Sequence, residues 1–191
     1  MAALCTTGRV CVLATVASAL AARNDMGRAI AALTEALELG EAGLPADSAA
    51  IRALAVAGNN LAVALEERAV RSAFETRAMI VAAEAGLPYW TQAGAWLEAE
   101  RAEYRLARSL LQSGQAQAAT SHARRCLDLC EQHSAAPFER FFGHAVLALA
   151  HRALGCNADF EMHRQSAIRQ LARVEEADRA ACDTTQAELA D

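Results

Sequence analysis

Residues 13–36 read LATVASALAARNDMGRAIAALTEA, and this stretch carries the pattern that decides the fold. Alanines and aliphatic residues recur three and four positions apart before and after Arg23-Asn24-Asp25, which places them on one face of a helix on each side. Asn and Asp favour a turn at that point, because their side chains bond to nearby backbone groups. The stretch therefore predicts a helical hairpin, with helices at about 9–23 and 26–42.

Three further stretches repeat this hairpin pattern. We predict the helix pairs 48–67 with 69–85, 91–112 with 115–133, and 138–154 with 158–177. Stacking the first helices aligns a column of alanines at intervals of 45, 45 and 41 residues: Ala17, Ala62, Ala107 and Ala148. Three residues later a second column holds Leu20, Leu65, Leu110 and His151. Small residues beside large aliphatic ones are what closely packed helix pairs require.

Prolines and glycines divide the chain between these helices. The pentapeptide EAGLP occurs at 41–45 and again at 84–88, and such a self-match is typical of repeat proteins. The chain has three prolines, Pro45, Pro88 and Pro137. Because proline is excluded from helix interiors, we expect each one to mark a boundary between units. We also expect Gly114 and Gly155 to end their helices in the left-handed conformation.

The composition favours an all-α fold and excludes several kinds of function. About a quarter of the 191 residues are alanine, the best helix former, whereas the chain has only 10 glycines and 3 prolines. The net charge of −5 argues against a general nucleic-acid-binding protein. All 18 basic residues are arginines, so neither a P-loop lysine nor a Schiff-base lysine exists. With no catalytic motif found, we expect no enzyme and no cofactor.

The residue columns resemble the tetratricopeptide repeat family. Its first helix carries a large residue, an aliphatic, a Gly or Ala and then an aromatic or Leu, and its second helix carries Ala, an aromatic and Ala. The best match here is Leu13, Val16, Ala17, Leu20, Ala29, Leu33 and Ala36; the third unit matches with Leu106, Ala107, Leu110, Ala119, Ala123 and Cys126. Phe74 and Phe160 depart from the motif, and the period exceeds the family's usual length of about 34 residues.

This resemblance implies an α-solenoid of about four antiparallel helix pairs in a right-handed superhelix, forming a single domain over 1–191. The units would span about 9–44, 47–88, 90–135 and 137–175, with 176–191 as a polar C-terminal helical extension, cap or tail. A closed helical bundle is the structural alternative. The internal period of 45 residues favours the solenoid, which leaves an open concave face.

One stripe of side chains suggests a binding site in that concave face. Arg101, Tyr104, Arg105 and Arg108 lie on one side of a predicted first helix, and the family resemblance places such helices along the groove, here beside Asn59 and Asn60. Guanidinium groups bind carboxylates, and Asn side chains bind a peptide backbone. With Phe142 as an apolar anchor, the candidate groove residues are Asn59, Asn60, Arg101, Tyr104, Arg105, Arg108 and Phe142.

Each of these assignments has a structural alternative. The arginines could instead pair with nearby glutamates, which are Glu66, Glu67, Glu98, Glu100 and Glu103, and Phe142 could fill a gap between helices. Asn60, Arg101 and Arg105 resemble the carboxylate clamp of some tetratricopeptide proteins. Ala14 and Ser18 stand where that clamp has a lysine and an asparagine, so we do not expect a chaperone clamp.

The positions of the cysteines and histidines in the sequence do not predict a metal site. The six cysteines are scattered and indicate reduced thiols in a cytoplasmic protein, although residues 10–22 also resemble a signal peptide. His122, Cys126, Cys130 and His133 share one helix face, but the outer pair lies roughly 16 Å apart, too far for one ion. His151 replaces a leucine of its column and is expected to be a packed histidine, on the same face as His144.

The sequence thus predicts a cytoplasmic protein-binding module that holds a peptide or protein partner, with acidic groups, in a concave groove. Neither nucleic acid nor membrane is expected as a direct partner, and a homodimer is left open. One alternative is a ligand-sensing or regulatory module of a bacterial signalling or transcription system. Another is an all-α enzyme or metal-binding protein.

Overall fold

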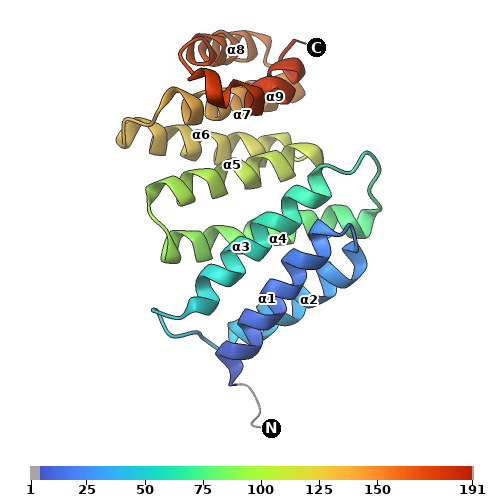
Figure 1. Cartoon of the computed structure of the whole chain (residues 1–191). Helices are drawn as coiled ribbons and strands as arrows, with labels where there is room; N and C mark the ends of the chain where they lie inside the picture. The colour runs from blue at the N-terminus through green and yellow to red at the C-terminus, as the bar shows by residue number, and fades with distance from the viewer. Residues whose placement is uncertain (1–4, 191) are drawn as a thin grey trace. The chain divides into compact units, whose positions relative to one another are not determined.

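Helices form nearly all of the regular structure in the computed structural model, which describes residues 5–190 (Figure 1). In chain order they are α1 (Thr6–Ala22), α2 (Met26–Glu41), α3 (Ala49–Glu66), α4 (Ala73–Ala93), α5 (Trp96–Gln112), α6 (Ala116–Gln132), α7 (Pro137–Ala153), α8 (Asn157–Leu171), the 3-10 helix η1 (Glu176–Cys182) and α9 (Asp183–Glu188). The described residues contain no strand. The all-α prediction is confirmed, whereas the solenoid arrangement stays a prediction.

The chain divides into two compact units within α5, after Arg105 and before Leu106. In the first unit α1 packs against both α2 and α3, and α3 packs against α4. In the second unit α7 packs against both α6 and α8, while α9 contacts α7 and η1. The division therefore falls inside the third predicted hairpin.

Four helix ends share one backbone geometry, which we call the Schellman turn. One follows α6, where Ser134 has a φ of 50° and the Ala135 N–H donates to the Cys130 carbonyl at 2.8 Å. The other three are hairpin turns. A residue just past α1, α5 and α7 has a positive φ: Asn24 at 60°, Gly114 at 81° and Gly155 at 73°. The next N–H donates to the carbonyl five positions back: Asp25 to Leu20 at 3.0 Å, Gln115 to Leu110 at 2.9 Å and Cys156 to His151 at 2.9 Å. This bond satisfies a carbonyl that the helix end leaves open. The helix ends predicted at Gly114 and Gly155 are confirmed.

The predicted alanine column is buried throughout. Ala17, Ala62, Ala107 and Ala148 are each 0% exposed. In the first unit α3 and α4 approach each other closely, and a Cβ on Gly58 would stand 2.6 Å from the carbonyl oxygen of Ala82 and 3.2 Å from the nitrogen of Gly86. Only a residue without a side chain fits such a crossing. Small residues therefore set how closely these helices pack.

The prediction that Pro88 marks a boundary is wrong. Pro88 lies inside α4, which continues to Ala93, whereas Pro45 lies in a loop and Pro137 opens α7. Proline removes one helical hydrogen bond, and here the packed surface on both sides of it keeps the helix continuous: Gly86 is buried against α3 and the hydroxyl of Tyr89 lies beside Gly40. The two EAGLP copies thus differ in conformation, since 41–45 ends a helix and enters a loop while 84–88 is helical throughout.

The predicted start of this helix at residue 69 is also wrong, because α4 begins at Ala73. Ser72 caps the helix by accepting a hydrogen bond from the Glu75 backbone N–H at 3.2 Å, and the Glu75 carboxylate accepts one from the Ser72 N–H at 2.8 Å. This reciprocal capping box fixes the first turn. Residues 67–72 consequently form a loop between α3 and α4.

The expected C-terminal helical extension is present, but it is not purely polar. Cys182 and Leu189 are buried and join the apolar cluster of α7 and α8 around Phe141, which is 0% exposed. Arg164 of α8 also donates to the Leu189 carbonyl at 3.0 Å. The extension is therefore part of the second unit's core, and the expectation of a polar tail is wrong at these two residues.

Two further features concern the cysteines and the apolar segments. All six cysteines, which lie within the described residues, are free thiols, and Cys126, Cys130 and Cys182 are buried. None of the helices between residues 5 and 190 combines the length and the apolar character that crossing a bilayer requires.

The close crossing of α3 and α4 predicts that one added methyl group at Gly58 destabilises the chain. Gly58→Ala should lower the free energy of unfolding by roughly 1–3 kcal/mol, because the new Cβ meets backbone atoms that cannot rotate away. Gly27→Ala is the matched control, since nothing lies within 4 Å of its Cβ and alanine favours the helix by up to about 1 kcal/mol. Urea denaturation measures both, and equal stability of the two variants would contradict the close crossing.

Candidate functional site

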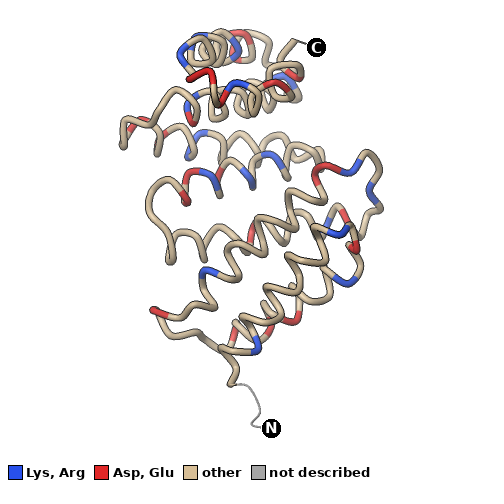
Figure 2. Tube along the Cα trace, in the orientation of Figure 1, with Lys and Arg blue, Asp and Glu red and all other residues tan. Residues whose placement is uncertain are grey.

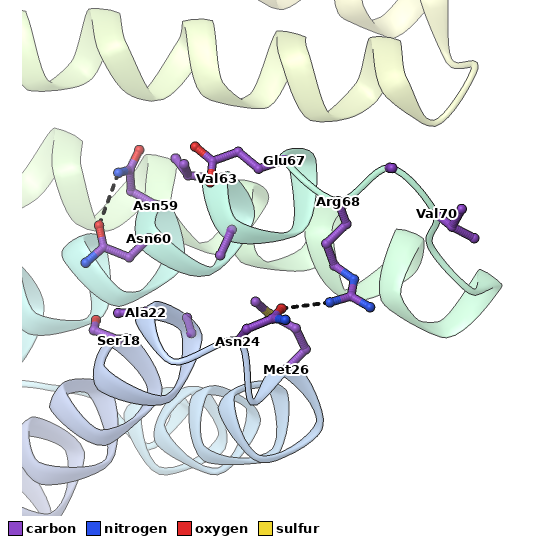
Figure 3. A pocket seen from close by; sticks show the side chains of 13 residues that line it. Ser18, Ala22, Asn24, Met26, Asn59, Asn60, Val63, Glu67, Arg68 and Val70 are labelled. Carbon is purple, nitrogen blue, oxygen red and sulfur yellow. Dashed lines mark hydrogen bonds between the residues drawn. The ribbon is translucent and has the colours of Figure 1, made fainter.

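A cleft of about 940 Å³ lies in the first unit between α1 and α3 (Figure 3). We call it the α1–α3 cleft. The residues that line it are Ser18, Ala21, Ala22, Asn24, Met26, Asn59, Asn60, Val63, Ala64, Glu67, Arg68, Ala69 and Val70. They come from the end of α1, the α1–α2 turn, the second half of α3 and the loop that follows α3. Two of the predicted groove residues, Asn59 and Asn60, are among them.

The cleft exists because α3 turns different faces to its two neighbours. Gly58 faces α4 at the close crossing, and Asn60 lies two residues later, about 200° around the helix. Asn60 is accordingly exposed, and Asn59 is half-buried. The same packing that buries the glycine therefore presents the two amides to solvent on the α1 side.

Asn59 and Asn60 form an amide pair on the edge of the cleft. The Asn59 Nδ2 donates to the Asn60 Oδ1 at 3.5 Å, and Figure 3 shows both side chains on α3 with Ser18 and Ala22 of α1 opposite. Each amide has a carbonyl acceptor and an NH₂ donor. Such a pair offers both kinds of hydrogen bond that an extended peptide backbone needs.

One end of the cleft is closed by Arg68. Its Nη1 donates to the Asn24 Oδ1 at 2.8 Å (Figure 3), and its Nε lies 3.3 Å from the Glu75 Oε1. The hydrogen bonds from Ser72, followed by the charges of Arg68 and Arg71, hold the pKa of the Glu75 carboxyl below its usual value. The guanidinium of Arg68 thus bridges the α1–α2 turn to the start of α4.

Charge is scarce along the helices that form the walls. α1 carries one charged residue, Arg9, and α3 carries two, Arg52 and Glu66 (Figure 2). The charged lining residues are Glu67 and Arg68, both at the same end. The middle of the cleft therefore consists of amide, hydroxyl and small apolar side chains.

The arginine stripe is partly occupied by carboxylates of this chain. Arg105 pairs with Glu66, whose side chain is only 6% exposed, and the Arg105 guanidinium lies 5.7 Å from the ring centre of Tyr104. This is the glutamate pairing named above as the alternative. Arg101 is exposed. The assignment of these residues to a binding groove stays a prediction.

Arg108 belongs to the second unit and has a partner far along the chain. Its Nη1 and Nη2 donate to the two oxygens of Glu188 at 2.5 and 2.9 Å, and its side chain is 12% exposed. A two-bond contact of this kind is the strongest geometry available to a guanidinium and a carboxylate. The pairing ties α5 to α9. It was not foreseen, because no sequence pattern relates the two residues.

Phe142 packs inside the aromatic group at the start of α7. Its ring centre lies 5.0 Å from those of both Phe138 and Phe141, in edge-to-face arrangements. Phe141 is fully buried, while Phe142 is half-buried against the core of the second unit. Both rings therefore belong to one apolar cluster, so the expectation that these adjacent residues cannot share a core is wrong. The role of Phe142 as an anchor for a partner stays a prediction.

His144 and His163 form a second polar group in the second unit. Their Nδ1 atoms lie 3.1 Å apart, so one ring donates a hydrogen bond to the other. Burial, followed by the charges of His163, Arg169 and Arg140, lowers the pKa of His144 to about 4. Burial lowers the pKa of His163 as well. Both rings are therefore neutral at pH 7.

Removing the Arg105 side chain should lower the stability of the chain, because the Glu66 carboxylate loses the cation that pairs with it. Arg105→Met should lower the free energy of unfolding by about 3 kcal/mol, because Glu66 would stay buried without this cation. The control is Arg28→Met, which removes a pair whose arginine side chain is 76% exposed and should cost less than about 1 kcal/mol. A loss in the Arg105 variant no larger than in the control would contradict the buried pairing.

The low pKa of His144 should make stability depend on pH. The unfolded chain takes up a proton at His144 near pH 6.5 but the folded chain only near pH 4, so stability falls as the pH drops between these values. His144→Gln should flatten this part of the melting-temperature profile. Identical slopes in the His144→Gln variant and the unmodified chain would refute the burial effect.

Comparison with known proteins assigns no family to this chain. No protein-family model matches the sequence. No curated protein matches it either. The resemblance to tetratricopeptide repeats accordingly stays a prediction that rests on the residue columns, and the geometry of the α1–α3 cleft is the basis for a functional assignment.

Proposed function

We propose that this chain is a protein-binding module that holds an extended segment of a partner protein in the α1–α3 cleft. The observation that carries the proposal is the Asn59–Asn60 amide pair at the edge of a cleft of about 940 Å³. Clefts of this size hold short peptides or similar ligands. The amides would bond to the backbone of the segment, as a β-strand neighbour does, without requiring a particular side chain.

The rest of the lining suits such a segment. Alanines at positions 21, 22 and 64 are too small to fill the space, which leaves room for the partner's side chains. Val63 and the highly exposed Val70, which is 80% exposed, supply apolar surface along the rim. Burial of that surface would contribute affinity, while the amides would set the direction of the bound chain.

The proposal does not require an acidic partner. The predicted preference for acidic groups rested on the arginine stripe, and both Arg105 and Arg108 already bind carboxylates of this chain. Within the cleft, Glu67 and Arg68 balance each other and lie at one end. A segment whose central residues carry no charge fits this distribution best.

A selection from a random peptide library displayed on phage tests the proposal. Peptides that bind the purified chain should have extended, uncharged central residues. Asn59→Ala with Asn60→Ala should weaken their binding at least tenfold, measured by fluorescence anisotropy, because the backbone contacts are lost.

The matched control is Gln92→Ala, which removes an exposed amide from α4 outside this cleft and should leave the affinity unchanged. Chemical-shift changes on peptide binding should centre on the lining residues. Peptides that bind equally well to the double variant, or shifts centred elsewhere, would refute the assigned site. Failure of the whole library to yield a binder would count against a peptide-binding role.

A further inference from the structure

The turn between α7 and α8 brings together three side chains of the kinds that bind metal ions. These are His151 near the end of α7, Cys156 in the turn and Asp159 in the first turn of α8. One nitrogen, the sulfur and one carboxylate oxygen all lie within 4.8 Å of one another. The group lies wholly in the second unit and is separate from the α1–α3 cleft.

The Schellman turn explains why residues this far apart in sequence converge. It returns the chain sharply, so that the Cys156 N–H bonds to the His151 carbonyl at 2.9 Å. A Schellman turn frequently brings the side chains at these two positions into contact. Asp159 follows one helical turn later, on the same side of α8.

The other three Schellman turns show what the backbone itself needs at these positions. Their equivalent residues are Leu20, Asp25 and Arg28 after α1, Leu110, Gln115 and Ala118 after α5, and Cys130, Ala135 and Phe138 after α6. None of these sets contains a histidine, and none holds more than one metal-binding side chain. The same backbone therefore forms without a set of metal-binding side chains, and folding of the turn does not account for the set at 151, 156 and 159.

His151 supplies the second, independent observation. The residue is 5% exposed, and its buried Nδ1 has no hydrogen-bond partner. The nearest carboxylate oxygen, Oδ2 of Asp159, is 3.9 Å away, which is too long for a hydrogen bond. The ring stacks in parallel on His163 at 5.7 Å between centres, which holds its orientation. A buried, oriented nitrogen without a hydrogen-bond partner requires an explanation, and a role as a metal ligand supplies one.

We propose that His151 Nδ1, Cys156 Sγ and the Asp159 carboxylate bind a zinc ion, with water in the fourth position. A neutral imidazole, a thiolate and a carboxylate are all ligands that Zn²⁺ accepts, at distances of about 2.0–2.3 Å. The thiolate selects zinc over Mg²⁺ and Ca²⁺. The thiol proton leaves on binding, so the two negative ligands balance the charge of the ion.

Small side-chain movements are enough to complete the site. Atoms that share a tetrahedral zinc ion lie about 3.3–3.8 Å from each other. Cys156 and Asp159 are exposed and can rotate toward the fixed His151 ring. The bound ion would tie the end of α7 to the start of α8, and the folded chain would gain stability because the unfolded chain lacks this arrangement.

Cobalt binding tests the site on the full chain, purified without a histidine tag and kept reduced with a phosphine. Co²⁺ should bind with one-to-one stoichiometry and give both the absorption of a tetrahedral ion and a sulfur-to-cobalt charge-transfer band. Zn²⁺ should displace it and raise the melting temperature. The band should disappear in Cys156→Ser, and the affinity for Zn²⁺ should fall at least tenfold in Asp159→Asn.

Two further variants make the result decisive. His151→Leu should fold, since the Schellman turns after α1 and α5 carry leucine there, and should lose cobalt binding. Cys156→Ser changes an exposed residue and keeps the test valid if the leucine variant does not fold. Cys5→Ser, at an exposed thiol outside the site, should bind as the unmodified chain does. A thiolate band that survives in Cys156→Ser, or no stoichiometric binding at micromolar concentration, would overturn the proposal.

Discussion

Close approach of helix backbones is the constraint on which the rest of this structure depends. At the crossing of α3 and α4 a single methyl group on Gly58 would meet backbone atoms, and the alanine column is buried without exception in both units. Small residues bring helices together but fill little volume. Large side chains such as Leu54, Leu61 and Met79 fill the buried space beside them. The α1–α3 cleft lies on another side of α3, where Asn60 is exposed.

Most of the fold follows from apolar periodicity and turn chemistry. Repeated small residues at helical spacing predicted the hairpins, and a left-handed residue at Gly114 and Gly155 ended the helices where expected. The prediction failed at Pro88, because its rule treats proline as a local signal. Tertiary packing of Gly86 and Tyr89 on either side outweighs the one hydrogen bond that proline removes.

The candidate site was less predictable, because it depends on partners that sequence spacing does not reveal. Asn59 and Asn60 line a cleft. The pairing of Arg105 with a glutamate was one of the two interpretations that the sequence allowed for the arginine stripe. The contact of Arg108 with Glu188 joins residues that no local pattern connects. The convergence of residues 151, 156 and 159 could have been found from the sequence, by aligning the turns and not only the helices that they join.

The two EAGLP copies bear on how the first unit assembles. The copy at 41–45 leaves a helix and enters a loop, whereas the copy at 84–88 is helical throughout. The conformational preference of the pentapeptide alone therefore determines neither structure. The helical copy includes a proline and a glycine, both poor helix formers, and gains its conformation from contact with α3. The middle of α4 therefore has little reason to become ordered by itself. Its order is cooperative with that of its neighbour, and the second hairpin should form as one event rather than helix by helix.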